Sequence, residues 1–119
     1  MGIQKTPLLT VDVVILCEGS ILLIRRRNPP FQGMLALPGG FVEIGETTEQ
    51  AAAREALEEA GMDIRITGLV GVYSDPARDP RRHTVSVCYL ARGMGTPAAG
   101  SDAKSVELFN IERVPDLAF

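Results

Sequence analysis

Three glutamates, Glu55, Glu58 and Glu59, stand three and four residues apart in one short stretch of the sequence. On an α-helix, residues at these spacings are neighbours, so the three carboxylates would share an arc of about 100°. Like charges at this spacing repel one another by a few tenths of a kcal/mol per pair, and a divalent cation removes that repulsion. The spacing alone favours a solvated acidic helix face, and a divalent-cation site is the alternative, which the wider pattern of residues favours.

The ligand type selects the metal. Carboxylate oxygens are hard donors, and the cluster contains no histidine or cysteine. Such a donor set favours Mg²⁺, with Mn²⁺ as a substitute, over zinc or copper. Mg²⁺ held by a few carboxylates usually completes its coordination with water and substrate phosphate.

The segment from Thr47 to Ala60, which carries these glutamates, is predicted to be a helix. Thr47 with Gln50 three residues later is the capping-box pattern. Gly61 stands where a left-handed residue commonly ends a helix. We expect the apolar stripe, opposite the glutamates, to consist of Ala53, Ala56, Leu57 and Ala60.

Apolar and β-branched runs on both sides of this helix predict strands. A mixed sheet of class α/β (α+β), covered by at least one helix, follows from this order of elements. The 119 residues suit a single domain, 1–119, and the final residues 116–119 resemble the start of a further helix beyond Phe119. The expected strands are 8–17, 21–26, 62–73, 84–91 and 106–111, with bends or bulges at Gly68 and Gly71 and a loop at 74–82.

Charge and composition exclude several classes of protein. Residues 43–63 hold seven acids and one base, whereas the rest of the chain is mildly basic and has no basic stripe, so we expect no nucleic acid polymer as partner. No apolar run approaches the roughly 20 residues of a membrane span. Two isolated cysteines, Cys17 and Cys88, are too few for a disulfide framework and predict a reducing cytoplasmic location.

The wider pattern around the glutamates resembles the signature of the Nudix hydrolases. Every glycine, arginine and glutamate of that signature is present at its spacing, and only Ala56 and Met62 replace the preferred Ile, Leu or Val. The entry into it, Ala36 to Glu43, also looks like the family's. The matching residues are Gly40, Glu46, Arg54, Glu55, Glu58, Glu59 and Gly61.

The resemblance implies an α/β/α sandwich that hydrolyses a nucleoside diphosphate linked to another moiety. It assigns Glu55, Glu58 and Glu59 as metal ligands together with a backbone carbonyl at Gly39 or Gly40. Glu46 and Arg54 would orient these carboxylates. The family often places a further acid outside the signature as base or extra ligand. We prefer Asp102 to Glu107 for this role, and Glu58 or Glu59 acting directly on the water is the alternative.

The segment from Gly71 to Val87 resembles the ADP-ribose pyrophosphatases of this family. That likeness implies cleavage of ADP-ribose to AMP and ribose 5-phosphate, and the family often forms homodimers. The alternatives are a pyrophosphohydrolase of oxidised nucleoside triphosphates and a non-catalytic nucleotide sensor. The expected substrate contacts are Arg26, Arg78, Arg81 and His83, with Phe31 and Leu35 as candidate pocket residues; a solvated loop and a polar strand edge are the alternatives.

Overall fold

The structure is a computed structural model, and it describes residues 5–97 and 103–113. Asp102 and the helix expected beyond Phe119 lie outside the described residues. The elements are, in chain order, β1 (Leu8–Cys17), β2 (Ser20–Arg26), β3 (Leu35–Ala36), β4 (Gly39–Phe41), α1 (Thr48–Ala60), β5 (Asp63–Tyr73), β6 (Thr84–Met94), β7 (Ala103–Asn110) and the short 3₁₀ helix η1 (Ile111–Arg113).

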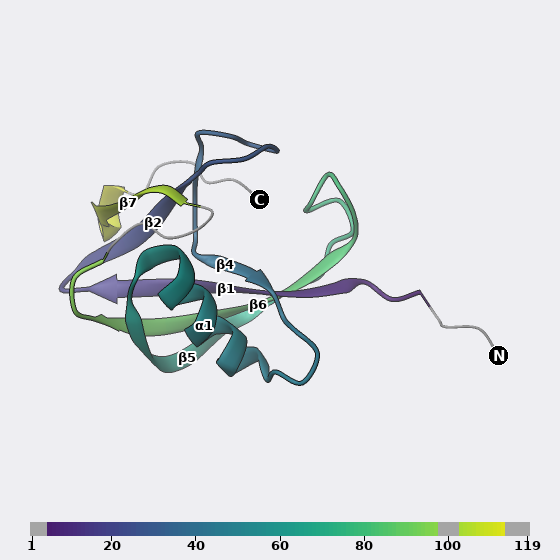
Figure 1. Cartoon of the computed structure of the whole chain (residues 1–119), viewed down its shortest axis with the longest axis horizontal. Helices are drawn as coiled ribbons and strands as arrows, with labels where there is room; N and C mark the ends of the chain where they lie inside the picture. The colour runs from purple at the N-terminus through teal and green to yellow at the C-terminus, as the bar shows by residue number, and fades with distance from the viewer. Residues whose placement is uncertain (1–4, 98–102, 114–119) are drawn as a thin grey trace.

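The strands form one mixed sheet in the order β3-β2-β1-β6-β5, with β4 paired to β1 and β7 paired to β2 (Figure 1). β1 runs parallel to β6 and antiparallel to β2 and β4. α1 lies across one face of this sheet, as Figure 1 shows. The predicted mixed sheet with a covering helix is confirmed in the described part of the chain.

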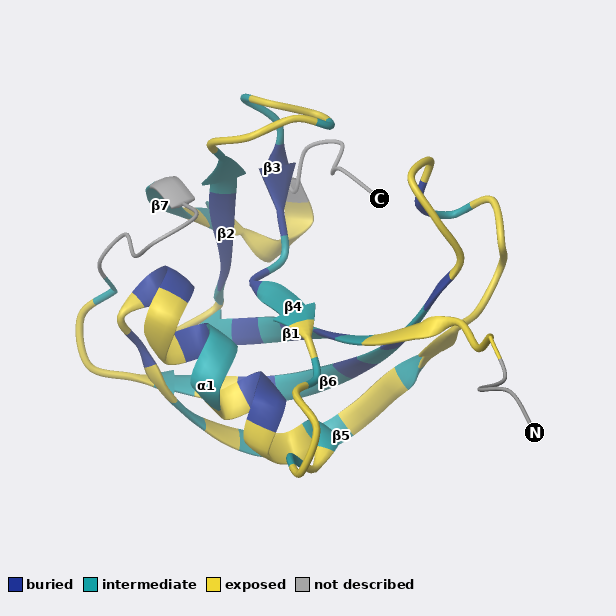
Figure 2. Cartoon of the chain, turned by 45° about the vertical axis from the view of Figure 1, so that its right-hand side comes forward, coloured by how far each residue is buried: buried dark blue, intermediate teal, exposed yellow. Residues whose placement is uncertain are grey.

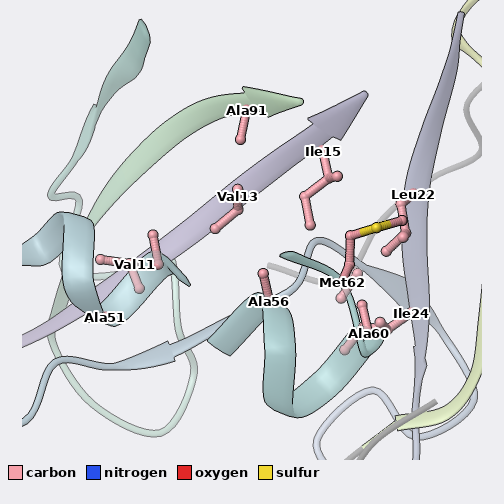
Figure 3. Close-up of a cluster of buried hydrophobic side chains, with 12 residues drawn as sticks. Val11, Val13, Ile15, Leu22, Ile24, Ala51, Ala56, Ala60, Met62 and Ala91 are labelled. Atoms are coloured by element: carbon pink, nitrogen blue, oxygen red, sulfur yellow. The ribbon is translucent and has the colours of Figure 1, made fainter. Parts of the chain in front are cut away.

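The core lies between β1 and α1. β1 alternates buried and half-buried residues, so Val11, Val13 and Ile15 all face the helix. Figure 3 shows these side chains opposite the alanines of α1, with Met62 beside Leu22 of β2. The small alanines let the helix backbone approach the sheet closely, and this brings the glutamates of α1 to the edge of β4.

The predicted apolar stripe of the helix is partly wrong. Ala56 and Ala60 are buried as expected, but Ala53 is exposed and Leu57 is 55% exposed. The helix instead docks through the face that carries Ala51, Ala52, Ala56, Ala60 and Glu59. This face has the smallest side chains, and it places Glu55 and Glu59 beside the sheet instead of opposite the buried stripe.

The ends of α1 agree with the sequence prediction. The Thr47 side chain accepts a hydrogen bond from the Gln50 N–H, and the Gln50 side chain accepts one from the Thr47 N–H, which completes the capping box. Gly61 adopts the left-handed conformation at φ 59° and its N–H bonds to the carbonyls of Ala56 and Leu57. Both signals are local, so the sequence alone is sufficient to place the helix.

The strands agree with the predicted ranges, with small differences at their ends. The β5–β6 register shifts at Gly68 and Gly71, where bends were predicted. β6 extends three residues beyond the predicted Ala91, to Met94. β7 begins at Ala103 and ends at Asn110, because Ile111 already starts η1. No helix in the described residues is long and apolar enough to cross a membrane.

We expect Thr47→Ala to lower the free energy of unfolding by about 1 kcal/mol, because the Gln50 N–H loses its partner at the start of α1. Urea denaturation of both proteins measures this difference. Thr6→Ala, at an exposed threonine before β1, is the matched control and should leave the midpoint unchanged. Equal stability of Thr47→Ala and the parent chain would contradict the capping role.

Candidate active site

Arg54 is the centre of a carboxylate cluster at the junction of α1, β4 and the loop between them. Its Nε and Nη2 donate to the two oxygens of Glu46 at 2.7 and 2.9 Å. Its Nη1 donates to Glu55 at 2.6 Å and to Glu58 at 3.2 Å. Its Nη2 also donates to the Phe41 carbonyl of β4 at 2.9 Å. One side chain thus joins the helix, the loop and the strand, and it contacts two of the carboxylates that the family resemblance has it orient.

Glu46 forms the strongest of these pairs. Its carboxylate accepts both guanidinium hydrogen bonds and also the Glu43 N–H at 2.9 Å, which closes the turn of the loop. The Arg54 hydrogen bonds lower the pKa of Glu46 to about 2, and the Glu43 backbone bond adds to this. In turn, the Glu46 carboxylate raises the pKa of Arg54. Both groups are therefore charged at neutral pH.

Two glycines of β4 leave bare backbone beside the glutamates. A Cβ on Gly40 would lie 2.6 Å from Glu55 Oε1, so any side chain there would displace this carboxylate. The Gly39 N–H donates to Glu59 Oε1 at 3.3 Å, and Glu59 is only 6% exposed. The absence of a side chain at Gly40 is what allows the Glu55 carboxylate to lie against the strand.

The three predicted metal ligands differ in exposure. The Glu55 side chain is 12% exposed and the Glu58 side chain 50%, and both share Nη1 of Arg54. Glu59 is turned toward Gly39. In the part of the chain that the structure describes, no three acids, histidines or cysteines form a ready-made coordination sphere. The donors nevertheless fit a hard divalent cation, since carboxylates outnumber the one arginine and bare backbone lies beside them.

A cavity of about 150 Å³ opens next to this cluster, and Gly40 and Glu59 form part of its wall. Three of the four predicted substrate contacts, Arg26, Arg78 and Arg81, line the same cavity. The cavity therefore brings one helix glutamate, Glu59, together with arginines that are far from it in the sequence.

The loop of residues 74–83 between β5 and β6 supplies two of these arginines. It is mainly exposed, with a buried stretch at Asp79 (Figure 2). The Asp79 carboxylate accepts two guanidinium hydrogen bonds from Arg81, at 3.0 and 2.8 Å, which lower the pKa of Asp79. The Arg82 guanidinium lies 5.3 Å from the centre of the Phe41 ring. The Asp79–Arg81 pair stabilises the conformation of the loop, and the Arg82–Phe41 contact attaches the loop to β4.

The other predicted substrate-contact and pocket residues lie outside the cavity lining. The His83 Nε2 pairs with the Ser74 carbonyl at 2.9 Å at the base of the loop, outside the cavity lining. Leu35 packs with Ile21 and Leu23 in a second apolar cluster. Neither Leu35 nor Phe31 lines the cavity.

Glu107 on β7 belongs to a separate ion pair. Its Oε2 accepts from Arg25 Nε at 3.0 Å and also from the Ser105 hydroxyl at 3.3 Å. The cavity lining does not include Glu107. These contacts favour a structural role for Glu107, and the preferred candidate base, Asp102, lies outside the described residues.

Sequence reasoning missed four polar residues on β1 and β6. Thr10, Asp12 and Thr84 line the cavity, and Ser86 bonds to Asp12. The sequence did offer one signal for this site. Asp12 is a single charged residue inside the apolar run of β1, and charged residues are rarely buried without a partner.

The sequence profile of the NUDIX domain matches residues 6–119. This chain belongs to the Nudix family. Nudix hydrolases generally use divalent metal ions, in agreement with the donor set described above.

Individual Nudix relatives support this assignment. The ADP-ribose pyrophosphatase of Methanocaldococcus jannaschii is 48% identical over 114 residues, which is 95% of this chain and 68% of the relative. The crystal structure of a MutT/nudix family protein from Enterococcus faecalis is 41% identical with a TM-score of 0.85, and the match covers 96% of this chain but 48% of that one.

A third Nudix relative was crystallised with a ligand. The NUDIX domain of Shewanella oneidensis NrtR, complexed with ADP ribose, is 28% identical with a TM-score of 0.78, over 92% of this chain and 76% of that one. Together these comparisons confirm the predicted family and the α/β fold class.

The Glu46–Arg54 pair should make stability depend on pH. The pKa of Glu46 is about 2 in the folded chain against an ordinary 4.5, so the pair stabilises fully above about pH 4.5. That contribution is lost as the pH falls from 4.5 toward 2. We expect the difference in Tm between the parent chain and Glu46→Gln to shrink between pH 5 and pH 3.

Thermal unfolding of both proteins across this pH range provides the measurement. Asp63→Asn, an exposed carboxylate at the start of β5, is the control and should show no such trend. A Tm difference that stays constant from pH 5 to pH 3 would contradict the lowered pKa.

Proposed function

We propose that this chain is a pyrophosphohydrolase that requires a divalent metal ion and cleaves ADP-ribose to AMP and ribose 5-phosphate. Mg²⁺ is the proposed metal, and Mn²⁺ a substitute for it. The observation that carries the proposal is the cavity that joins the carboxylate cluster, through Gly40 and Glu59, to Arg26, Arg78 and Arg81. The names of the archaeal relative and of the ADP-ribose complex support the choice of substrate.

The charges in this cavity suit a diphosphate. ADP-ribose carries negative charge on both phosphates, and guanidinium groups bind phosphate oxygens through strong, charge-assisted hydrogen bonds. A cation bound by the carboxylates would stabilise charge on the departing phosphate and lower the pKa of a bound water. A purely acidic cavity would repel this substrate, so the arginines are required.

Each residue of the cluster has a task in this proposal. Glu55, Glu58 and Glu59 would bind the cation, and the carbonyl of Gly40 would add a backbone oxygen. Arg54 fixes Glu55 and Glu58 through its Nη1, while its bidentate pair with Glu46 fixes Arg54 itself. The Gly39 N–H orients Glu59.

The reaction adds water across the anhydride. The water oxygen bonds to phosphorus, the bridging P–O bond breaks, and the proton released from water passes to a carboxylate. Glu58 has the most exposed side chain of the three helix carboxylates and is the proposed acceptor within the described residues. Asp102 stays the alternative outside them.

A hydrolysis panel with Mg²⁺ tests the proposed function. It compares ADP-ribose, NADH, a dinucleoside polyphosphate, dGTP and 8-oxo-dGTP, with products separated by chromatography and EDTA as control. We expect AMP and ribose 5-phosphate from ADP-ribose, and no turnover with EDTA. Pyrophosphate release from a triphosphate, with ADP-ribose untouched, would overturn the substrate. Binding of ADP-ribose without turnover would favour a sensor.

We expect Glu59→Gln to reduce kcat by at least about 100-fold with Tm changed by only a few degrees, because the amide keeps the size of the side chain but removes the charge that a cation needs. Steady-state kinetics and thermal unfolding measure both quantities. Asp63→Asn is the control for removal of one negative charge. Full activity in both Glu58→Gln and Glu59→Gln would exclude the proposed metal ligands.

The homodimer and the cytoplasmic location are also proposals. β5 is the last strand of the sheet as described, and it exposes Leu69, Val70, Val72 and Tyr73, a surface suited to a second copy of the chain. Sedimentation velocity should give the mass of a dimer. Cys17 and Cys88 are both free thiols, which fits a reducing compartment.

A further inference from the structure

A polar patch lies on the sheet face that is turned away from α1. β1 and β6 are parallel neighbours in the register Thr10–Ser86, and along β1 the buried Val11 and Val13 face the helix. By alternation, Thr10 and Asp12 face the other way. Ser86 and Thr84 are 0% and 2% exposed. Burial of polar groups is unfavourable unless they are hydrogen-bonded, so each buried polar group of this patch requires a hydrogen-bond partner.

Asp12 is the charged member of the patch. Its Oδ2 accepts a hydrogen bond from the Ser86 hydroxyl and lies 4.0 Å from Nη2 of Arg78. Its Oδ1 rests against the backbone of Gly39, where an added Cβ would approach it to 2.6 Å. The carboxylate therefore lies between β6 and β4, in contact with both strands.

Arg78 has an unused donor. The Arg78 Nε is buried and has no hydrogen-bond partner among the described residues, although its side chain lines the cavity. The other arginine of the loop that lines the cavity, Arg81, instead donates two guanidinium hydrogen bonds to Asp79. A buried N–H at a cavity wall is satisfied when a ligand places an acceptor oxygen there.

We propose that Asp12 and Ser86 are positioning residues that hold the Arg78 guanidinium in the cavity, with its Nε–H directed at a phosphate oxygen of the substrate. This inference rests on the proposed function, because it assigns one end of the same cavity. Ser86 fixes Asp12, Asp12 attracts Arg78 by charge, and Arg78 contacts the substrate. Neither Asp12 nor Ser86 touches the reacting atoms in this scheme.

The test separates binding from turnover. The probe is ADP-ribose with a methylene group in place of the bridging oxygen, which cannot be hydrolysed, titrated calorimetrically in the presence of Mg²⁺. The variants are Asp12→Asn, Arg78→Gln and the double variant. Asp12→Asn preserves side-chain size and its bond to Ser86 but removes the charge that attracts Arg78. Asp63→Asn is the control.

We expect Kd to rise about 30-fold in Arg78→Gln, which removes a hydrogen bond from a charged donor to the probe, and about 10-fold in Asp12→Asn, which removes the charge opposite Arg78. The double variant should bind no worse than Arg78→Gln, because Asp12 acts through Arg78. In hydrolysis of ADP-ribose, KM should rise in Asp12→Asn while kcat stays within about 3-fold. Should Asp12→Asn not fold, Ser86→Ala gives the same test with a smaller expected rise in Kd.

Three results would overturn this inference. If the fold-changes in Kd of the two single variants multiply in the double variant, Asp12 does not act through Arg78. A loss of kcat with unchanged KM would place Asp12 in the chemical step. A lower Tm in Asp12→Asn with unchanged Kd would leave only a structural role. If the parent chain neither binds the probe nor hydrolyses ADP-ribose, the proposed function itself fails, and this inference fails with it.

Discussion

The site depends on one contact network, the guanidinium of Arg54 among four carboxylates. Glu46 and Arg54 are eight residues apart, and their bidentate pair ties the loop before α1 to the helix. The same guanidinium reaches the Phe41 carbonyl, which ties the helix to β4. Glu43, Glu55 and Glu58 also lie within 4.0 Å of it. Without a positive charge at its centre this many acids would repel one another, so the Arg54 guanidinium lets the cluster form without a bound metal ion.

The second constraint is steric. Gly39 and Gly40 face opposite sides of the sheet, and a carboxylate rests against each: Asp12 against Gly39 and Glu55 against Gly40. A side chain at Gly40 would displace the Glu55 carboxylate, and one at Gly39 would clash with the Val11 carbonyl and the Asp12 carboxylate. Because β4 has no side chains at these two positions, the acidic cluster lies on one side of this short strand and the Asp12 carboxylate lies on the other.

Local signals made the helix and its glutamates predictable. The capping box at Thr47 and the left-handed Gly61 each involve only a few residues, and the pattern from Gly40 to Gly61 lies in one continuous stretch, so no tertiary information was needed. The docking face of α1 was not predictable, because it depends on how closely alanines approach β1. The Ser86–Asp12 bond joins residues 74 positions apart and exists only through the parallel pairing of β1 and β6. The Arg25–Glu107 pair likewise required the register of β2 with β7.

The most direct test of the proposed metal site is a titration of the chain with Mn²⁺, in which electron paramagnetic resonance measures the concentration of unbound ion. We expect Mn²⁺ to bind the parent chain and Asp63→Asn, and to bind Glu59→Gln at least about 10-fold more weakly, because one charged ligand is lost. Equal affinity in Glu59→Gln and the parent chain would contradict the claim that Arg54 and the β4 glycines arrange these carboxylates around a cation.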